Sequence, residues 1–309
     1  MKLSIVTTLY RSAPYVEEFH RRASAAARTL VEDDYEIVMV NDGSPDNALE
    51  LAVKLTEQDQ HVVVVDLSRN FGHHKAMMTG LAHATGEQVF LIDIDLEEEP
   101  EWLVDFVEQM EQEKCDVVYG VQQQRKGRLF ERWSGELFWR AFRSISGLPV
   151  PKNLVTARIM SRRYVDALLL HQEREVFMAG LLYITGFVQK ERVVTKLSTS
   201  PSTYSLRARV SLALNAILSF TSSPLVWIFY AGLLISTCSA LYVVYLLLQK
   251  IALNQFVSGW ASLIASTWLL GGLMILFISV IGMYVSKVFN EVKQRPYSIV
   301  RALYKNRKM

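Results

Sequence analysis

The sequence has few cysteines and almost no net charge. Its two cysteines, Cys115 and Cys238, lie far apart in dissimilar surroundings, so we expect two free thiols, as in a reducing compartment. Acidic and basic residues nearly balance, at a formal net charge of +2, so the composition gives no sign of nucleic-acid binding. The first residues also lack the long apolar run and small-residue cleavage site of a signal peptide. We therefore expect the N-terminal part of the chain to stay in the cytoplasm.

Two common phosphate-binding motifs are absent as well. The loop after the first expected strand contains neither G-x-G-x-x-G nor G-K-[ST]. This excludes the usual dinucleotide and P-loop cradles at that position. If the protein binds a nucleotide, it must hold the phosphates by another device.

Hydrophobic residues, by contrast, make up 50% of the chain, and the excess is concentrated near the C-terminus. No residue is charged from Leu225 to Leu248 or from Gln255 to Ser286. Each run exceeds the ~20 residues that cross the hydrocarbon core of a bilayer. The alternative is a pair of buried helices in a soluble core, but such helices are usually shorter and carry polar residues on one face. We predict transmembrane helices at 224–249 and 256–286.

Basic residues decide the expected orientation of these helices. The connector between them carries one basic residue, Lys250, whereas the segment 287–309 is rich in lysine and arginine. The positive-inside rule then predicts a multi-pass protein of the inner (plasma) membrane, with the N-terminal domain and the basic tail 287–309 in the cytoplasm. Segment 204–223 has apolar residues at helical spacing and predicts an amphipathic helix in the membrane interface, with a core-packed connecting helix as the alternative.

Residues 1–203 alternate between short apolar runs and helix-like stretches. This alternation predicts an α/β domain with a mostly parallel sheet, and strands that are apolar throughout fit a sheet covered on both faces. The expected strands are Leu3–Thr8, Tyr35–Val40, Val62–Leu67, Val89–Ile94 and Asp116–Val121. The expected helices are Pro14–Leu30, Asp46–Gln58, Lys75–Ala84 and Pro100–Glu113. In such sheets ligands bind beyond the carboxyl ends of the strands, so the residues that follow each strand are the candidate site.

Acidic residues follow the fourth expected strand. Asp93 and Asp95 stand at its end, and Glu97 precedes a turn that leads to Pro100. Such a turn can gather the three carboxylates around one hard divalent cation, which keeps further coordination sites for a diphosphate. The cation would neutralise the charge on a departing nucleoside diphosphate. Most D-x-D pairs are solvated surface acids, but this position at the end of a buried strand favours a metal site.

Two other strand ends carry polar residues with more than one interpretation. Asp42 follows the second strand and can bind a ribose hydroxyl or a base N–H, or it can simply cap a turn or the next helix. His73 and His74 follow the third strand, and adjacent histidines point apart on most backbones. We interpret them as polar loop residues rather than metal ligands.

Taken together, these motifs resemble the family-2 glycosyltransferases of the GT-A fold. The resemblance is greatest to polyprenyl-phosphate sugar transferases such as dolichol-phosphate mannose synthases and bactoprenol glucosyltransferases, and it covers nearly the whole chain. The matching segments are 40–44, 67–72, 93–96, 100–101, 158–162, 177–180 and 204–206.

The resemblance implies roles for individual residues. The nucleotide-sugar donor, which is UDP-, GDP- or dTDP-linked, would be bound by Tyr10, Asp42, Asp93 and Lys75. Asp93, Asp95 and Glu97 would hold Mg²⁺ or Mn²⁺. Arg125, Arg128 and Arg158 would face the acceptor phosphate, and Asp95 and Arg158 are the residues expected to be catalytic. From the residues alone, the basic loop around Arg125 and Arg128 is equally consistent with a solvated turn or a lipid-headgroup patch.

The implied activity is inverting, metal-dependent transfer of a sugar to polyprenyl (undecaprenyl) phosphate at the cytoplasmic membrane face, for cell-surface polysaccharide or lipid modification. The sequence departs from its relatives at Thr8 and Ser12, at Val176, and at Thr156, where close relatives carry an aspartate. A phosphate acceptor is largely ionised near neutrality and does not depend on a general base. A hydroxyl acceptor depends on a general base more strongly.

Two alternatives remain open at this point. One is transfer to a hydroxyl of a lipid-linked or polysaccharide glycan; the other is an inactive membrane adaptor. Two helices are too few for a sugar channel, so we expect a separate flippase to move the product. Gly271, Gly272 and Gly282 would allow close helix contacts in a homo-oligomer.

Overall fold

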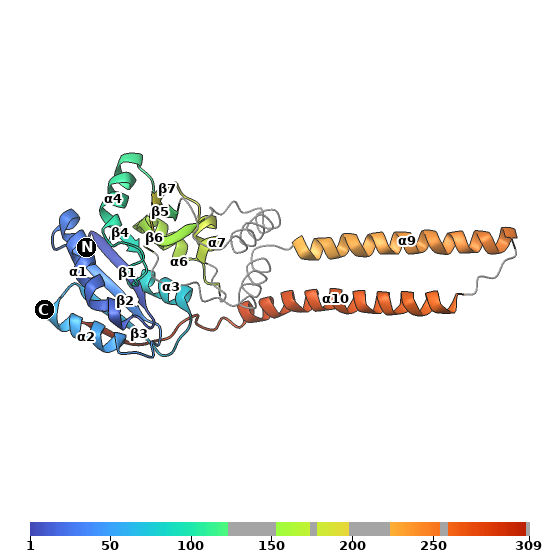
Figure 1. Ribbon diagram of the computed structural model, residues 1–309, viewed down its shortest axis with the longest axis horizontal. Coiled ribbons are helices and arrows are strands. Elements are labelled where there is room, and N and C mark those ends of the chain that lie inside the picture. The colour runs from blue at the N-terminus through green and yellow to red at the C-terminus, as the bar shows by residue number, and fades with distance from the viewer. Residues whose placement is uncertain (123–152, 174–177, 198–222, 254–258, 307–309) are drawn as a thin grey trace. The chain divides into compact units, whose positions relative to one another are not determined.

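The structure is a computed structural model that describes residues 1–122, 153–173, 178–197, 223–253 and 259–306. The chain divides into two compact units. The first holds the α/β domain together with the C-terminal residues from Arg295 onward, and the second holds the long helices of residues 223–294 (Figure 1).

The α/β unit is built on one eight-stranded sheet in the order β7-β5-β6-β4-β1-β2-β3-β8. Its strands are β1 (Leu3–Leu9), β2 (Tyr35–Asn41), β3 (Val62–Leu67), β4 (Gln88–Leu91), β5 (Val117–Gln122), β6 (Leu154–Ser161), β7 (Gln189–Val194) and β8 (Val300–Lys305). Strands β4, β1, β2 and β3 are parallel neighbours, and β5 and β7 are parallel to each other. Only β6 and β8 run against the others, so the expected α/β class with a mostly parallel sheet is confirmed.

Helices cover both faces of the sheet. They are α1 (Val16–Val31), α2 (Ala48–Gln58), α3 (His73–His83), α4 (Trp102–Glu113), α6 (Arg162–Leu169) and α7 (Met178–Ile184), with a short 3₁₀ turn η1 at Ala13–Tyr15. α1 contacts α2 and α4 on one face, and α3 contacts α6 on the other. Gly80 lets α3 approach closely, because a Cβ there would lie 2.5 Å from the Val6 side chain. This two-sided cover is why β1, β2 and β3 are buried along their whole length.

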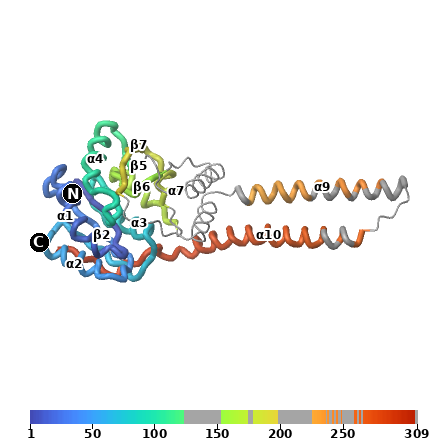
Figure 2. Tube along the Cα trace, viewed as in Figure 1, coloured from blue at the N-terminus to red at the C-terminus, as the bar shows by residue number. Residues whose placement is uncertain are grey.

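Three strands, β6, β7 and β8, are not among those expected from the sequence. β6 separates β4 from β5 and runs antiparallel to both, so β5 does not continue the parallel series directly. β8 lies within the segment expected to be only a basic tail, and it pairs antiparallel with β3, with Val64 opposite Tyr304. In Figure 2 the red C-terminal trace runs beside the blue N-terminal strands. Strand pairing with a partner distant in the chain leaves no local signal beyond an alternation in Val300–Lys305.

The second unit contains α9 (Ser223–Leu253) and α10 (Trp260–Val292). Among the described residues, one stretch is long and apolar enough to cross a membrane, Ser266–Val292, and Leu225–Ile235 is a shorter apolar stretch. Both cysteines are free, as expected, with Cys115 buried and Cys238 exposed. The proposed amphipathic helix at 204–223 lies almost wholly outside the described residues.

Candidate active site

The candidate site lies at the carboxyl edge of β1, β2, β3 and β4. After β4 the chain turns through Leu96, which adopts a left-handed conformation at φ 58°. The turn after β2 passes through Gly43 at φ 60°, where a Cβ would lie 2.5 Å from the backbone nitrogen of Asn70. A side chain at position 43 would therefore push apart the loops that follow β2 and β3. Local backbone geometry thus brings the loops after β2 and β3 close together.

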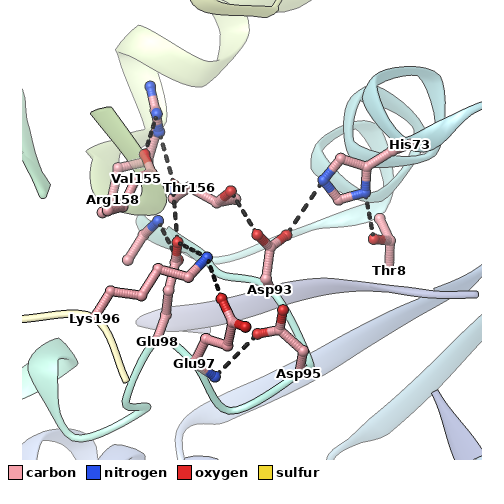
Figure 3. A network of polar contacts seen from close by, with 11 residues as sticks. Thr8, His73, Asp93, Asp95, Glu97, Glu98, Val155, Thr156, Arg158 and Lys196 are labelled. Carbon is pink, nitrogen blue, oxygen red and sulfur yellow. Dashed lines mark hydrogen bonds and ion pairs between the residues drawn. The ribbon is translucent and has the colours of Figure 1, made fainter. Parts of the chain in front are cut away.

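Asp93 is the centre of a polar network that joins three elements (Figure 3). Its Oδ2 accepts a hydrogen bond from Thr156 Oγ1 on β6 at 2.7 Å. Its Oδ1 lies 3.2 Å from His73 Nε2, and His73 Nδ1 lies 3.0 Å from Thr8 Oγ1 on β1. Although burial works in the opposite direction, His73 and Thr156 hold the pKa of Asp93 below its ordinary value. The Asp93 carboxylate is therefore ionised and fixed in orientation.

The next acidic residues in the turn have different partners. Asp95 Oδ1 accepts the backbone N–H of Glu97 at 3.0 Å, and burial raises the pKa of Asp95. The Glu97 carboxylate lies 3.2 Å from Lys196 Nζ. Glu98 is fully buried, and its two oxygens accept the backbone N–H groups of Thr156 at 3.0 Å and Ala157 at 2.7 Å. Burial, followed by the charge of Asp93, raises the pKa of Glu98 to about 7.

Glu98 thus joins the turn after β4 to the start of β6. It fixes the backbone at Thr156, and Thr156 in turn donates to Asp93. Lys196 lies within 3.5 Å of Glu98 as well, so one ammonium group serves two carboxylates. The acidic cluster is held by partners that are distant in the sequence.

The fit of a divalent cation can be tested on these contacts. Asp93 Oδ1 is buried and makes no hydrogen bond of good geometry, and Asp95 keeps Oδ2 outside any hydrogen bond that the structure records. Two neighbouring carboxylates suit Mg²⁺ or Mn²⁺, which are bound through one or two carboxylates plus phosphates and water. Across the described ranges, however, no three histidine, cysteine or carboxylate side chains are gathered as a ready-made metal site. Asp95 fits the cation with an oxygen outside these contacts, whereas Asp93 is engaged by His73 and Glu97 by Lys196.

Asp42 holds the loop after β3. Only 2% of Asp42 is exposed, and its two oxygens accept the backbone N–H groups of Phe71 at 2.7 Å and Gly72 at 3.0 Å. Burial raises the pKa of Asp42. The turn-fastening role is therefore present in the structure, and contact with a nucleoside stays a prediction.

Tyr10 and Lys75 lie at the same edge. Tyr10 follows β1 and is 47% exposed, with the Arg11 guanidinium 5.6 Å from the centre of its ring. An exposed aromatic ring at this edge can stack on a base. Lys75 lies in the first turn of α3 and is half-buried.

Arg158 lies deeper, on β6. It is 6% exposed, and its guanidinium donates to the main-chain carbonyls of Thr156 and Val155, both at 3.0 Å. It also lines a cavity of about 510 Å³ together with aromatic and aliphatic side chains, among them Tyr119 and Phe187. Arg125 and Arg128 lie outside the described residues.

Sequence reasoning missed or misjudged several members of this network. The sequence predicts a loop position for His73, which is wrong, because His73 begins α3 and lies against Asp93. Thr156 was noted only as a departure from relatives, and Glu98 only as part of the turn. Lys196 follows β7 and gave no signal, since its pairing with Glu97 depends on sheet order rather than on any local motif.

Comparison with known proteins adds a further set of observations. The family described as glycosyl transferase family 2 matches residues 4–169, more than half of the chain. A protein of Mycobacterium tuberculosis named among the glycosyltransferases is 48% identical over 98% of this chain and 89% of its own. The bactoprenol glucosyl transferase of Shigella phage SfII is 32% identical over 97% of this chain and 98% of its own.

Among solved structures, the chain is similar to the mannosyltransferase PcManGT from Pyrobaculum calidifontis in complex with GDP-Man and Mn²⁺. That similarity has a TM-score of 0.48 and 18% sequence identity, and it covers 95% of this chain and 86% of the other.

Proposed function

The chain belongs to glycosyl transferase family 2 and is a glycosyltransferase, and from this premise we propose that it transfers a sugar from a nucleoside-diphosphate sugar to a polyprenyl phosphate. The observation that supports a polyprenyl phosphate as the acceptor is the 32% identity, over nearly the full length of both chains, to a bactoprenol glucosyl transferase. Because the match continues beyond the α/β unit into the apolar helices, it includes the part of the chain that would meet a lipid.

The donor would bind at the carboxyl edge of the parallel strands. Tyr10 offers an exposed ring for the base, and Asp42 holds the adjoining loop in place. Lys75, in the first turn of α3, supplies a positive charge for the diphosphate. We propose these three residues, together with Asp93, as the nucleotide-sugar site.

A divalent cation, Mg²⁺ or Mn²⁺, would be held by Asp95 and by Asp93, whose Oδ1 would exchange its ion pair with His73 for the metal. When bound, it would supply positive charge next to the departing nucleoside diphosphate. Glu97 would join the ligands only by giving up Lys196. Thr156 and His73 keep the Asp93 carboxylate turned toward the edge of the sheet, so this part of the site is organised before any ligand arrives.

The reaction we propose is a single in-line displacement. An oxygen of the lipid phosphate attacks the anomeric carbon while the bond from that carbon to the nucleoside diphosphate breaks, which inverts the configuration. The hydroxyl of Thr156 donates to Asp93 and offers no general base, and a phosphate acceptor near neutrality does not require one. This favours a phosphate over a glycan hydroxyl as acceptor. Arg158, a buried cation on the wall of a largely apolar cavity, with Arg125 and Arg128, would serve the acceptor phosphate.

The membrane arrangement is part of the same proposal. Two transmembrane helices at 224–249 and 256–286 would follow an interfacial helix at 204–223, with the catalytic domain 1–203 and the tail 287–309 in the cytoplasm. The support is the uncharged sequence of both segments together with the long helices α9, which contains 224–249, and α10, which contains 260–286. A separate flippase and a homo-oligomer remain proposals that follow from size and from the helix glycines.

The test uses the full chain in detergent or nanodiscs. UDP-, GDP- and dTDP-linked sugars are each supplied with Mn²⁺ and a short-chain polyprenyl phosphate, and the lipid product is measured by mass spectrometry. We expect one donor to be used, with a sugar-1-phosphate lipid of inverted configuration as product and with turnover abolished by EDTA.

Two further arms make the outcome decisive. A lipid-linked glycan replaces the polyprenyl phosphate in one, and the acceptor is omitted in the other to measure donor hydrolysis. Turnover only with the glycan would overturn the proposal of a phosphate acceptor and would leave the proposed donor site standing. Absence of transfer and hydrolysis with every donor would overturn the proposed function itself.

A further inference from the structure

Asp66 is a buried carboxylate outside the network around Asp93. It lies on β3 and is 0% exposed. Burial of an ion costs several kcal/mol unless a partner of opposite charge and hydrogen bonds offset it. Asp66 Oδ2 accepts a hydrogen bond from Arg301 Nε at 2.7 Å, and Arg301 Nη2 forms an ion pair with the same oxygen at 2.7 Å. The cation that balances this charge therefore comes from β8, which follows the last apolar helix.

The other oxygen of Asp66 faces the strand-end loop of β2. Asp66 Oδ1 accepts a hydrogen bond from Asn41 Nδ2 at 2.8 Å, and the two residues are directly opposite each other in the β2–β3 ladder. An ionised carboxylate can only accept, so it requires the NH₂ side of the Asn41 amide. The amide oxygen then faces Ser44 and accepts its backbone N–H at 3.1 Å. The hydrogen bond to Asp66 thus sets which way the Asn41 amide is turned.

Ser44 connects the turn after β2 to the loop after β1. Its Oγ accepts the backbone N–H of Arg11 at 2.7 Å, next to Tyr10, and donates to Asp46. Asp46 also accepts the backbone N–H of Ala13 at 2.9 Å. The loops after β1 and β2, which carry the proposed donor-binding residues, are therefore fastened to each other through the turn that Asn41 closes.

We propose that Arg301 is a positioning residue for donor binding, which acts through Asp66 and Asn41 on the turn 41–44. The inference rests on the proposed function in so far as that turn holds the nucleotide. β8 is anchored to the same region by two further contacts, Ser68 N–H to the Ile299 carbonyl at 2.9 Å and Ser298 Oγ to Thr79 Oγ1 at 2.7 Å. The segment that follows the apolar helices thus contributes to donor binding through these contacts.

Loss of Arg301 has a defined consequence. Asp66 would be left as a buried carboxylate without the cation that pairs with it. Its side chain, no longer held by Arg301, could leave Asn41, and the amide would then be free to turn away from Ser44. The turn 41–44 would loosen, whereas Asp93 and Asp95 would keep their own partners. Donor affinity should fall, and the rate of transfer at saturating donor should not.

The test compares Arg301→Ala with Lys305→Ala, an exposed residue of the same strand, in the full chain with Mn²⁺. Binding of UDP, GDP and dTDP is measured by calorimetry, and hydrogen exchange is followed at residues 41–46. We expect Arg301→Ala to weaken the nucleotide that binds best by about tenfold, a factor typical of coupled contacts, and to raise the donor KM equally with kcat nearly unchanged. Exchange should quicken at 41–46, and the control should behave like the wild type.

A double variant separates positioning from simple loss of stability. Asp66→Asn combined with Arg301→Met removes both charges and keeps an acceptor for Asn41, so it should recover most of the nucleotide affinity. If Arg301→Ala does not fold, this double variant and Arg301→Lys decide the matter by the same measurements. Unchanged nucleotide binding in Arg301→Ala, or a fall in kcat at constant KM, would overturn the inference. So would a uniform rise in exchange across the whole sheet.

The two proposals fail in different ways. If the wild type transfers no sugar to a lipid phosphate but binds a nucleoside diphosphate, the acceptor is wrong and the Arg301 inference is still decided by affinity and exchange. If the wild type binds no nucleotide at all, the proposed donor site is wrong, and the role assigned to Arg301 is wrong as well.

Discussion

The raised pKa of Glu98 predicts an unusual dependence of stability on pH. Glu98 is fully buried, and its pKa is raised from 4.5 to about 7, by burial first and then by the charge of Asp93. A carboxyl group whose pKa is higher in the folded state stabilises the fold below its unfolded pKa. That contribution is lost as the pH rises through the folded pKa. We therefore expect the wild type to lose stability between about pH 4.5 and pH 7 on account of this residue.

The magnitude follows from the two pKa values. The difference between 4.5 and about 7 corresponds to about 3 kcal/mol of unfolding free energy. The side chain in Glu98→Gln cannot ionise, so the unfolding free energy of this variant does not fall with pH for this reason. Its amide does place an N–H group against the main-chain N–H groups of Thr156 and Ala157, which costs about 1–3 kcal/mol at every pH. The informative quantity is therefore the change with pH in the difference between variant and wild type.

The assay is thermal unfolding of the full chain in detergent from pH 4.5 to pH 8.5, with EDTA present so that no cation affects the acidic cluster. Relative to the wild type, Glu98→Gln should gain about 6–12 °C in Tm between the two ends of the range, given ~2–4 °C per kcal/mol for a domain of this size. Glu111→Gln, at an exposed position of α4, is the control and should show no such trend. A difference between Glu98→Gln and wild type that stays constant with pH would show that Glu98 is ionised throughout and would refute the reasoning.

Three further predictions concern the site. Asp95→Asn should lower turnover at least about 100-fold and weaken Mn²⁺ binding about tenfold, as measured by transfer rate and by electron paramagnetic resonance, with Glu111→Gln as a control that changes neither. Gly43→Ala should cost about 2–3 kcal/mol of unfolding free energy, because a Cβ there meets backbone, whereas Gly186→Ala, also at positive φ but in open space, should cost only about 1 kcal/mol. Thermal melts of the two glycine variants test this, and equal losses would contradict it. Thr156→Val removes a hydrogen bond to the partly buried Asp93 carboxylate, so kcat/KM should fall about tenfold; an unchanged value would mean that this contact does not orient the site.

Much of the α/β unit was predictable because its strands carry their own signal. Runs such as Val62–Leu67 are apolar and β-branched throughout, and only a strand buried on both faces has that pattern. Helix starts were less well placed: α3 begins at His73 rather than Lys75, since Gly72 and the residues after it carry no capping side chain that marks the boundary. The fourth strand is also shorter than expected and ends at Leu91.

The sequence by itself determined the class of the fold and the acidic residues that follow the fourth strand. These features depend on periodicity and on the order of elements, which are local properties of the chain. It also determined the uncharged helical segments, because a run without charge is visible without any knowledge of packing.

Only the tertiary structure decided the partners of the acidic residues. Thr156 is 63 residues from Asp93, and Arg301 is 235 residues from Asp66, so no local pattern could connect them. Their contacts depend on β6 lying next to β4 and on β8 lying next to β3, and sheet order is set by the packing of the whole domain. For the same reason Glu97, which the sequence places with the metal ligands, is paired with Lys196 in the folded protein.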